Sequence, residues 1–275
     1  MSGKLYLVAT PIGNLEDITL RAIKVLKSVD LVVAEDTRQT LKLLNHLEIS
    51  KPLISYHRHN EEIKVDGLIE KLKNGTDIAL VSDAGTPVIS DPGEIIVKEA
   101  INSGITVIPI PGACALINGL IASGLDAKEF SFIGFLSLNK KIRKEKLEEI
   151  ENENKTVILY EAPHKILNTL KDLKEVLGDR KIVLARELTK IHEEFLRGTV
   201  EEILEKYKEP RGEHIIIIEG SKTKKESIEN ELLNSMTIEQ QYEYYKKQNL
   251  PKNEIIKKIA KDRNVPKNEI YKLFI

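Results

Sequence analysis

The chain has 275 residues, 41% of them hydrophobic and 31% charged, a balance that excludes a disordered protein and indicates a folded one. No apolar run reaches the roughly 18 residues of a membrane span, and the N-terminus lacks the apolar core of a signal peptide, so we expect a cytoplasmic protein. The net charge is −1, and the single cysteine, Cys114, excludes an internal disulfide and a cysteine-rich zinc site.

The first half of the chain alternates short apolar runs with helical patterns. Strands are predicted at residues 5–9, 31–34, 78–81 and 106–110, and helices at 20–29, 37–47 and 94–103. Such alternation favours an α/β domain with a largely parallel sheet, whose strands are continuous apolar runs because both faces are covered. We place this domain at residues 1–123.

A second alternating region predicts a second α/β domain at residues 124–220. Its strands are predicted at 130–135, 156–160, 182–185 and 214–219, and its helices at 140–151 and 165–177. A polar stretch at 221–226 is typical of a linker, and residues 237–275 have the pattern of three short helices.

Basic residues gather in two places. From Lys246 to Ile275 the chain carries nine Lys or Arg and three Asp or Glu, a net charge of +6. A second cluster, KKIRKEK, begins at Lys140. Either patch can attract phosphate groups, and either can equally be a solvated helix face.

Five loops that follow predicted strands are rich in glycine, proline, aspartate and threonine. They lie at residues 9–19, 35–38, 81–93, 109–115 and 160–165. Ligands of open α/β sheets bind beyond the carboxyl ends of the strands, and glycine lets the backbone approach a ligand closely. These loops therefore predict a binding site for a small molecule.

Several common motifs are absent, and their absence reduces the number of ligand classes that the loops could bind. Without GxGxxG or GxxxxGK[ST], a dinucleotide-binding domain or a P-loop NTPase is disfavoured. HExxH, GxSxG and CxxC are also missing, and the six histidines show no metal-ligand spacing, so no metal is expected. The loops are uncharged or mildly acidic and suit a neutral or cationic molecule. Within VSDAGTPVISDPG (81–93), we expect Ser90 to Gly93 to begin the next helix, with Asp91 near its N-terminus.

The loop sequences together resemble one known family. The matching segments, spread over residues 5–220, are TPIGNLEDIT, AEDTR, HNE, SDAGTPVISDPG, PIPG, FIGFL, YEAPHK and RELTKIHEEFLRGT. They resemble the small-subunit methyltransferase I family, the 16S rRNA (cytidine-2′-O)-methyltransferases of the tetrapyrrole-methylase superfamily. Four positions depart from the pattern, with Cys114 and Ala162 in serine-like positions, Lys165 where arginine is common and Ser137 where proline is common.

The resemblance implies a fold, a cofactor and a substrate. The fold would be the two-domain α/β fold of class III S-adenosylmethionine (SAM) methyltransferases, here with a small helical RNA-binding module at 237–275. The substrate would be the ribose 2′-hydroxyl of a cytidine near the decoding centre of 16S rRNA, and the protein would be a homodimer. The residues implied to bind SAM are Pro11, Asp83, Gly85, Thr86, Pro87, Ile89, Ala113, Cys114, Glu161 and Ala162.

Methyl transfer to a hydroxyl is helped by a group that accepts its proton. Acidic residues in the matching segments supply candidates, of which Asp36 and Glu187 are preferred and Glu35 and Glu193 also considered. For each of them a structural ion pair is an equally open interpretation. The residues expected to contact RNA phosphates are Arg38, Arg186, Lys190, Lys257, Lys258, Lys261 and Arg263.

Two other functions stay open at this point. One is a related enzyme that methylates a small molecule or a protein, such as a corrin precursor or a diphthine-type substrate. The other is an RNA-binding assembly factor that has lost catalysis. The first gives no role to the basic C-terminal segment, and the second predicts degraded cofactor loops.

Overall fold

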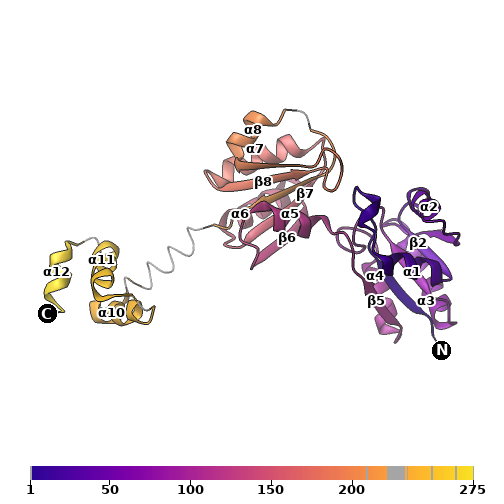
Figure 1. The fold of residues 1–275 in the computed structure, drawn as a ribbon, viewed down its shortest axis with the longest axis horizontal. Coiled ribbons are helices and arrows are strands. Elements are labelled where there is room, and N and C mark those ends of the chain that lie inside the picture. Colours follow the sequence, from indigo (N-terminus) through magenta and orange to yellow (C-terminus); the bar gives the residue numbers. More distant parts are fainter. Residues whose placement is uncertain are drawn as a thin grey trace.

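The computed structural model describes residues 2–208, 210–221, 233, 235–248, 250–263 and 265–274. Of the predicted linker at 221–226, all but Ser221 lies outside these residues. The described chain forms two α/β units and a group of three helices near the C-terminus (Figure 1). In this part of the chain, none of the helices has the length and apolar character that a membrane crossing needs.

The first unit is built on a sheet of five parallel strands in the order β3-β2-β4-β1-β5. The strands are β1 (Lys4–Val8), β2 (Leu31–Ala34), β3 (Leu53–Ser55), β4 (Ile78–Val81) and β5 (Thr106–Ile110). Both β2 and β4 are buried along their whole length, as expected for central strands covered on two faces. The prediction of a parallel sheet is confirmed, although β3 was missed.

Helices cover both faces of this sheet. They are α1 (Leu20–Ser28), α2 (Thr37–His46), α3 (Glu61–Lys73) and α4 (Glu94–Asn102). Alternate residues of β4 face opposite ways, so Leu80 packs with α3 and α4 while Ala79 packs with α1 and α2. The carboxyl ends of the strands are thereby left for the loops.

The second unit has a mixed sheet in the order β6-β7-β10-β8-β9. Its strands are β6 (Phe130–Phe135), β7 (Thr156–Glu161), β8 (Lys181–Arg186), β9 (Glu194–Thr199) and β10 (His214–Ile218). Because β10 runs antiparallel to β7 and β8, its first residue, His214, lies opposite Glu161 and Arg186. The start of β10 and the ends of β7 and β8 therefore share one edge.

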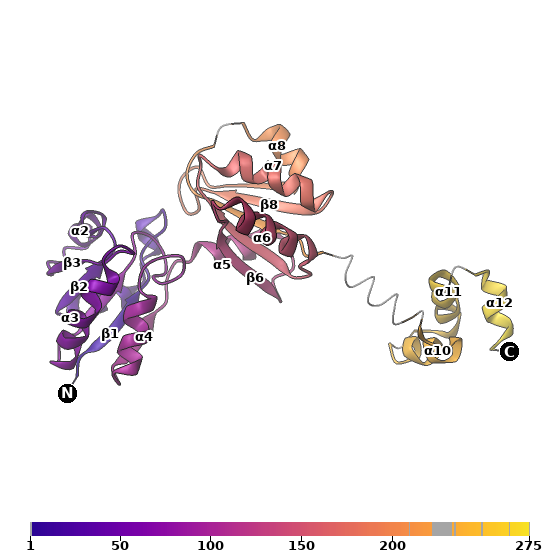
Figure 2. The ribbon, with the colours of Figure 1, turned by 180° about the vertical axis from the view of Figure 1, so that it is seen from behind.

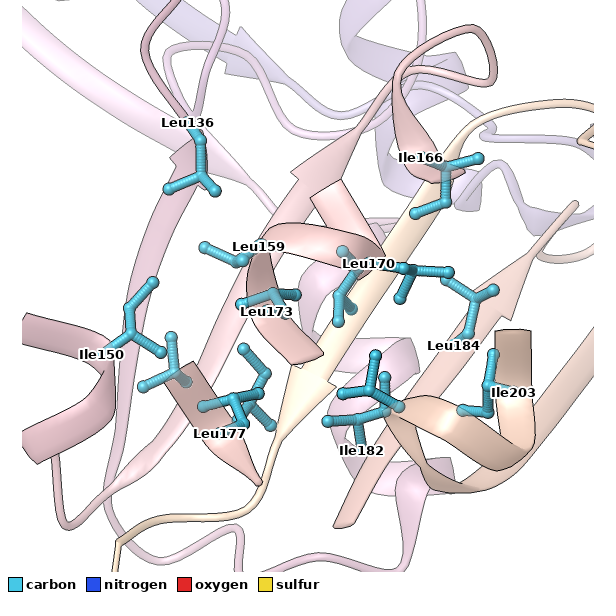
Figure 3. Packing of buried hydrophobic residues seen from close by; sticks show 14 of the residues in the cluster. Leu136, Ile150, Leu159, Ile166, Leu170, Leu173, Leu177, Ile182, Leu184 and Ile203 are labelled. Atoms are coloured by element: carbon cyan, nitrogen blue, oxygen red, sulfur yellow. The ribbon is translucent and has the colours of Figure 1, made fainter. Parts of the chain in front are cut away.

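Three helices cover one face of the second sheet, namely α6 (Lys140–Asn152), α7 (Ile166–Leu177) and α8 (Val200–Lys206). Figure 3 shows the core beneath them, where Leu170 and Leu173 of α7 pack with Leu159 of β7 and Leu184 of β8. Figure 2 shows the same helices from behind. A capping box formed by Thr199 and Glu202 begins α8. This helix was not predicted from the sequence.

The other face of the second sheet is covered by α5 (Ala115–Ser123). Leu116 and Leu120 pack against Ile158 and Ile215, and Gly119 brings the helix close to the Ile215 side chain. A predicted domain boundary at 123 places this helix in the first domain, whereas its contacts are with the second sheet. The two-domain division stays a prediction, and these contacts favour a boundary between β5 and α5.

The C-terminal helices form a small core of their own. They are α10 (Ile238–Lys246), α11 (Lys252–Asp262) and α12 (Lys267–Lys272). Ile255, Ile256 and Ile259 are buried against Tyr245 and Ile270. Ring stacking adds to this packing, with the Tyr242 and Phe274 centroids 4.4 Å apart.

Candidate active site

A cavity of about 310 Å³ lies where loops at the strand ends of both units meet. This volume is in the range of small-molecule sites. The cavity is lined by Ile12, Glu35, Asp83, Ala84, Gly85, Thr86, Ile89, Ser90, Asp91, Cys114, Ala115, Phe135, Tyr160, Glu161, Glu187, Leu188, Lys190, Glu213, His214 and Ile215. All five loops singled out by the sequence contribute to this lining, the first only through Ile12 and the second only through Glu35.

The turn after β4 forms one wall of the cavity. Gly85 exchanges two backbone hydrogen bonds with Thr10 of the first loop, at 2.8 and 3.0 Å. Gly85 has φ +83°, and a Cβ placed on it would lie 3.1 Å from the Ile12 side chain. The Thr86 hydroxyl donates to the carbonyl of Ala113 at 3.0 Å. Three loops are thus joined into one wall, and glycine is required where they meet.

The helix predicted at 94–103 is present as α4, but the further expectation that Ser90 to Gly93 begins it is wrong. Ser90 has φ +65° and Gly93 has φ +133°, neither of which is helical, so α4 begins only at Glu94. Val88 also has φ +77°, which is rare for a β-branched residue and costs about 1–3 kcal/mol. The turn folds back on itself and places Ser90 and Asp91 in the cavity wall.

Arg58, before α3, and Glu61, the first residue of α3, hold this turn in place. Arg58 donates to the carbonyl of Ser90 at 2.5 Å, and the Gly93 amide donates to the Glu61 carboxylate at 3.3 Å. These contacts give a structural reason for the HNE segment that the sequence comparison singled out, since its glutamate anchors the end of the turn. The backbone strain at Val88 and Ser90 is balanced by such fixed contacts.

Acidic side chains dominate the first-unit wall. Burial raises the pKa of Asp91 to about 6, and the negative charges of Glu35 and Asp83 add to the effect. Burial also raises the pKa of Glu35, again with a contribution from Asp83. Among the described residues these carboxyls do not form a group arranged to hold a metal ion. The wall is suited to a cationic group or a proton.

The second unit supplies the opposite wall. Glu161 is buried, and its two oxygens accept hydrogen bonds from the Thr169 hydroxyl at 2.6 Å and the Ala162 amide at 2.9 Å. The Tyr160 hydroxyl accepts a bond from the Leu116 amide at 2.9 Å. Burial lowers the pKa of His214 to about 4, so its ring is neutral at physiological pH. This wall is a preformed, hydrogen-bonded surface.

The two units touch at a close contact beside the cavity. A Cβ on Gly13 would lie 2.5 Å from the Leu188 carbonyl and 2.6 Å from the Lys190 side chain. On the other side of the contact, Glu187 and Thr189 have φ values of +52° and +63°. Gly13 therefore lets the loop after β8 settle against the first loop, and that loop brings Leu188 and Lys190 into the cavity.

The residues predicted to bind the cofactor divide into two groups. Six of the ten line the cavity: Asp83, Gly85, Thr86, Ile89, Cys114 and Glu161. The other four do not line it but adjoin lining residues: Pro11, Pro87, Ala113 and Ala162. Ala113 takes part through its carbonyl, which accepts the Thr86 hydroxyl, and Ala162 through its amide, which holds Glu161.

The residues predicted to be catalytic differ in their surroundings. Asp36 does not line the cavity; it caps α2 through the Arg38 amide and bonds the Arg38 guanidinium at 2.6 and 3.0 Å. Hydrogen bonds from Arg38 lower the pKa of Asp36 to about 2, which makes its carboxylate a weak base. Glu187 does line the cavity, and its carboxylate bonds the Lys190 ammonium at 2.8 Å.

The residues predicted to contact RNA are also placed differently. Arg186 bonds Glu194 at 2.6 Å and lies over the Tyr207 ring, while Arg263 bonds Gln241 at 2.7 Å inside the helical module. Lys257, Lys258 and Lys261 are exposed on α11. The three lysines present their charge to solvent, with Lys258 also lying over the Tyr245 ring at 4.9 Å, whereas the two arginines have internal hydrogen-bond partners.

Several lining residues escaped the sequence reasoning. Glu213 and His214 reach the cavity because β10 runs antiparallel to its neighbours, and strand direction is not visible in the sequence. Phe135 was expected only as a strand residue, whereas Tyr160 begins the fifth predicted loop but was not named as a binding residue. Asp91 stood within a motif that was examined, and its role was hidden by the expected helix.

Comparison with known proteins identifies the family of this fold and cavity. The tetrapyrrole (corrin/porphyrin) methylase family matches residues 4–204. Diphthine synthase has a similar solved structure, with a TM-score of 0.62 at 17% identity, covering 79% of this chain and 90% of the other. The uroporphyrin-III C-methyltransferase from Thermus thermophilus, complexed with S-adenosylhomocysteine, has a TM-score of 0.55 at 20% identity, covering 79% and 97%. At these identities the two structures establish the fold alone.

Proteins of similar sequence identify a narrower family within the tetrapyrrole methylases. The ribosomal RNA small subunit methyltransferase I of Halalkalibacterium halodurans is 51% identical over 274 residues, which is 99% of this chain and 94% of the relative. The protein of the same name from Bacillus subtilis is 50% identical, covering 94% and 90%. This chain belongs to the ribosomal RNA small subunit methyltransferase I family. The predicted family, the α/β fold class and the methyltransferase class are confirmed.

Proposed function

We propose that this protein transfers a methyl group from SAM to the ribose 2′-hydroxyl of a cytidine near the decoding centre of 16S rRNA. The observation that carries the proposal is the 51% identity to a relative over 99% of the chain, which includes the C-terminal helices. The strand-end cavity supports it independently, because its size, its mixture of apolar and carboxyl side chains and its fixed backbone suit a small cationic cofactor.

The residues of the cavity fit SAM. Gly85 forms a cradle that any side chain would fill, and Ile12, Ile89 and Leu188 offer apolar surface for a flat ring. Glu35 and Asp83 would offer negative charge to the ammonium and sulfonium groups. When bound, SAM supplies an electrophilic methyl carbon.

The assignment of the ten predicted residues to SAM binding remains a proposal. The six that line the cavity would contact SAM directly. The four that do not line the cavity would act through their backbone or by fixing a neighbour. Asp83 also accepts the Asp36 amide at 2.9 Å, so one carboxylate joins the loops after β2 and β4. An Asp83 substitution would therefore disturb two loops.

Catalysis would depend on alignment and on desolvation. The attacking hydroxyl has to lie in line with the bond that breaks, and holding two reactants in this way supplies a large part of the barrier reduction. Walls from two units, joined at Gly13, fix the position of both reactants relative to one another. Lys190 at the cavity would attract the phosphate that flanks the target ribose.

RNA binding would rest chiefly on the helical module. Lys257, Lys258 and Lys261 are exposed along α11, and the segment from Lys246 carries a net charge of +6. Contacts of lysine with phosphate give strong salt dependence and little sequence selectivity. We also propose that the protein is cytoplasmic, where its substrate is assembled, and that it is a homodimer.

The decisive experiment maps 2′-O-methylation on 16S rRNA from cells that lack the protein. Loss of one cytidine methylation, restored by the gene and by purified protein with SAM and small subunits, is the expected result. Parallel assays with free rRNA, a corrin precursor and a diphthine precursor separate this activity from those of other superfamily members. Intact rRNA methylation together with methylation of a small molecule or protein would contradict the proposal.

A further inference from the structure

Asp91 is a half-buried carboxyl group in the cavity wall that has no arginine or lysine of its own. Asp36 is occupied by Arg38 and Glu187 by Lys190, whereas Asp91 takes part in no ion pair within the described part of the chain. An ion-paired carboxylate is a poor proton acceptor because the cation stabilises its charged form. Among the described residues Asp91 has no such pair, and the positive charge of Arg58 stabilises its carboxylate less than burial and the charge of Glu35 destabilise it.

The position of Asp91 is held by a strained turn. Ser90 is fixed by Arg58, which precedes α3, and Gly93, two residues after Asp91, is fixed by Glu61, the first residue of α3. Val88 and Ser90 keep positive φ angles. Unfavourable backbone conformations that are over-determined by their surroundings gather at functional sites. The turn places Asp91 in the cavity wall, and α4 begins only at Glu94.

The charges that face Asp91 come from every neighbouring element. Burial contributes most to its raised pKa, followed by Glu35 after β2; the Ser82 hydroxyl and Arg58 act in the opposite direction, and Asp83 has a smaller raising effect. From the second unit, burial raises the pKa of Tyr160, and the negative charge of Asp91 makes a smaller contribution to that rise. A base whose pKa lies near the working pH is the most effective proton acceptor.

Resting on the methyl transfer proposed above, we infer that Asp91 is the general base that accepts the proton of the ribose 2′-hydroxyl. The O–H bond breaks as the oxygen forms its bond to the methyl carbon, and the proton passes to the Asp91 carboxylate. The carbon–sulfur bond breaks, and its electron pair stays on sulfur, which becomes a neutral thioether. The proton then leaves Asp91 to solvent. This assignment replaces Asp36 and Glu187 as the preferred candidates.

The test is the pH dependence of methyl transfer under single-turnover conditions, with small subunits from cells that lack the protein. For the unaltered enzyme the rate rises between about pH 5 and pH 7, since Asp91 must be ionised to act. Asp91→Asn lowers the rate at about pH 8 by about a hundredfold or more and removes the rise with pH, while the Kd for SAM, measured by calorimetry, stays within about threefold. Asp91→Glu restores part of the rate.

A second variant separates a base from a structural residue. Glu35→Gln removes the negative charge next to Asp91, so the midpoint of the rising limb moves to lower pH by about half a unit or more. Glu94→Gln, an exposed residue of the following helix, leaves rate and midpoint unchanged. The inference is overturned if Asp91→Asn keeps more than about a tenth of the rate, if it abolishes SAM binding, or if the wild-type limb is flat. Failure of the unaltered enzyme to methylate rRNA would instead overturn the proposed function.

Discussion

At the residue scale, a carboxyl group that works as a base is expected to reduce the stability of the fold. Burial raises the pKa of Asp91 from its ordinary 3.8 to about 6. The folded state therefore holds the proton more tightly than the unfolded state does. The resulting stabilisation is present below about pH 4 and is lost as the pH rises through about 6.

We predict that Asp91→Asn raises the melting temperature at alkaline pH. The amide has the same shape and no charge to bury, and after allowance for partial exposure the gain is about 1 kcal/mol, or roughly 2–4 °C. Melting curves at about pH 8 and pH 4 measure it, with no gain at the lower pH. Glu94→Gln is the matched control, and a lower melting temperature for Asp91→Asn at pH 8 would refute the prediction.

Residue roles could be predicted from the sequence only in part. Asp83, Gly85 and Thr86 stood in a recognisable motif and do line the cavity. Asp91 belonged to the same motif but was expected near the start of the following helix and not in the cavity wall, because a positive φ at Ser90 leaves no sign in a sequence. Asp36 and Glu187 were chosen by position, and only coordinates reveal that each has a cationic partner.

At the element scale, the loops meet at glycines that cannot be replaced without cost. We predict that Gly85→Ala weakens SAM binding by about tenfold, because alanine is disfavoured at φ +83° by about 1–2 kcal/mol and its Cβ would press on Ile12. Calorimetric titration with SAM provides the measurement.

Gly104 offers a matched control for this effect. It has φ +69°, and a Cβ there would have no atom within 4 Å. Gly104→Ala therefore carries a similar conformational cost without disturbing the cavity, so stability falls and SAM affinity does not. Equal loss of SAM affinity in both variants would point to general destabilisation and against a role for Gly85 in the cavity.

Elements with long apolar runs were predictable, and short or edge elements were not. The strands β2 and β4 are fully buried and their sequences are continuously apolar. In contrast, β3 has three residues, and β9 is an edge strand whose side chains are mostly half-buried, so neither carries a clear pattern. Gly67 interrupts α3 and weakens its helical signal.

At the scale of the whole molecule, the helical module has a hydrophobic core of its own. Its net charge is also different, because residues 246–275 carry +6 while the whole chain carries −1. We predict that removing the residues after Ser221 weakens rRNA binding by about tenfold or more while leaving the Kd for SAM unchanged, because phosphate contacts are lost and the cavity is not touched. Filter binding at several salt concentrations is the measurement.

A charge variant refines this prediction. A plot of log affinity against log salt has a negative slope. Replacing Lys257, Lys258 and Lys261 with glutamine should reduce the magnitude of that slope by about 2. The same number of charges can be removed from α6 by replacing Lys140, Lys141 and Lys144, which are also exposed. An equal effect of both triple variants would contradict a special role for the C-terminal module.

The chain passes between the two α/β units through one short segment, which runs from Ile110 at the end of β5 to Ala115 at the start of α5. Yet the cavity takes its walls from both units and closes beside the contact of Gly13 with Leu188. A ligand bound in this cavity would contact both units at once and would link them in addition to the single covalent connection. Its binding energy would add to the cohesion of the pair, so that a protein saturated with cofactor resists separation of its halves before any RNA arrives.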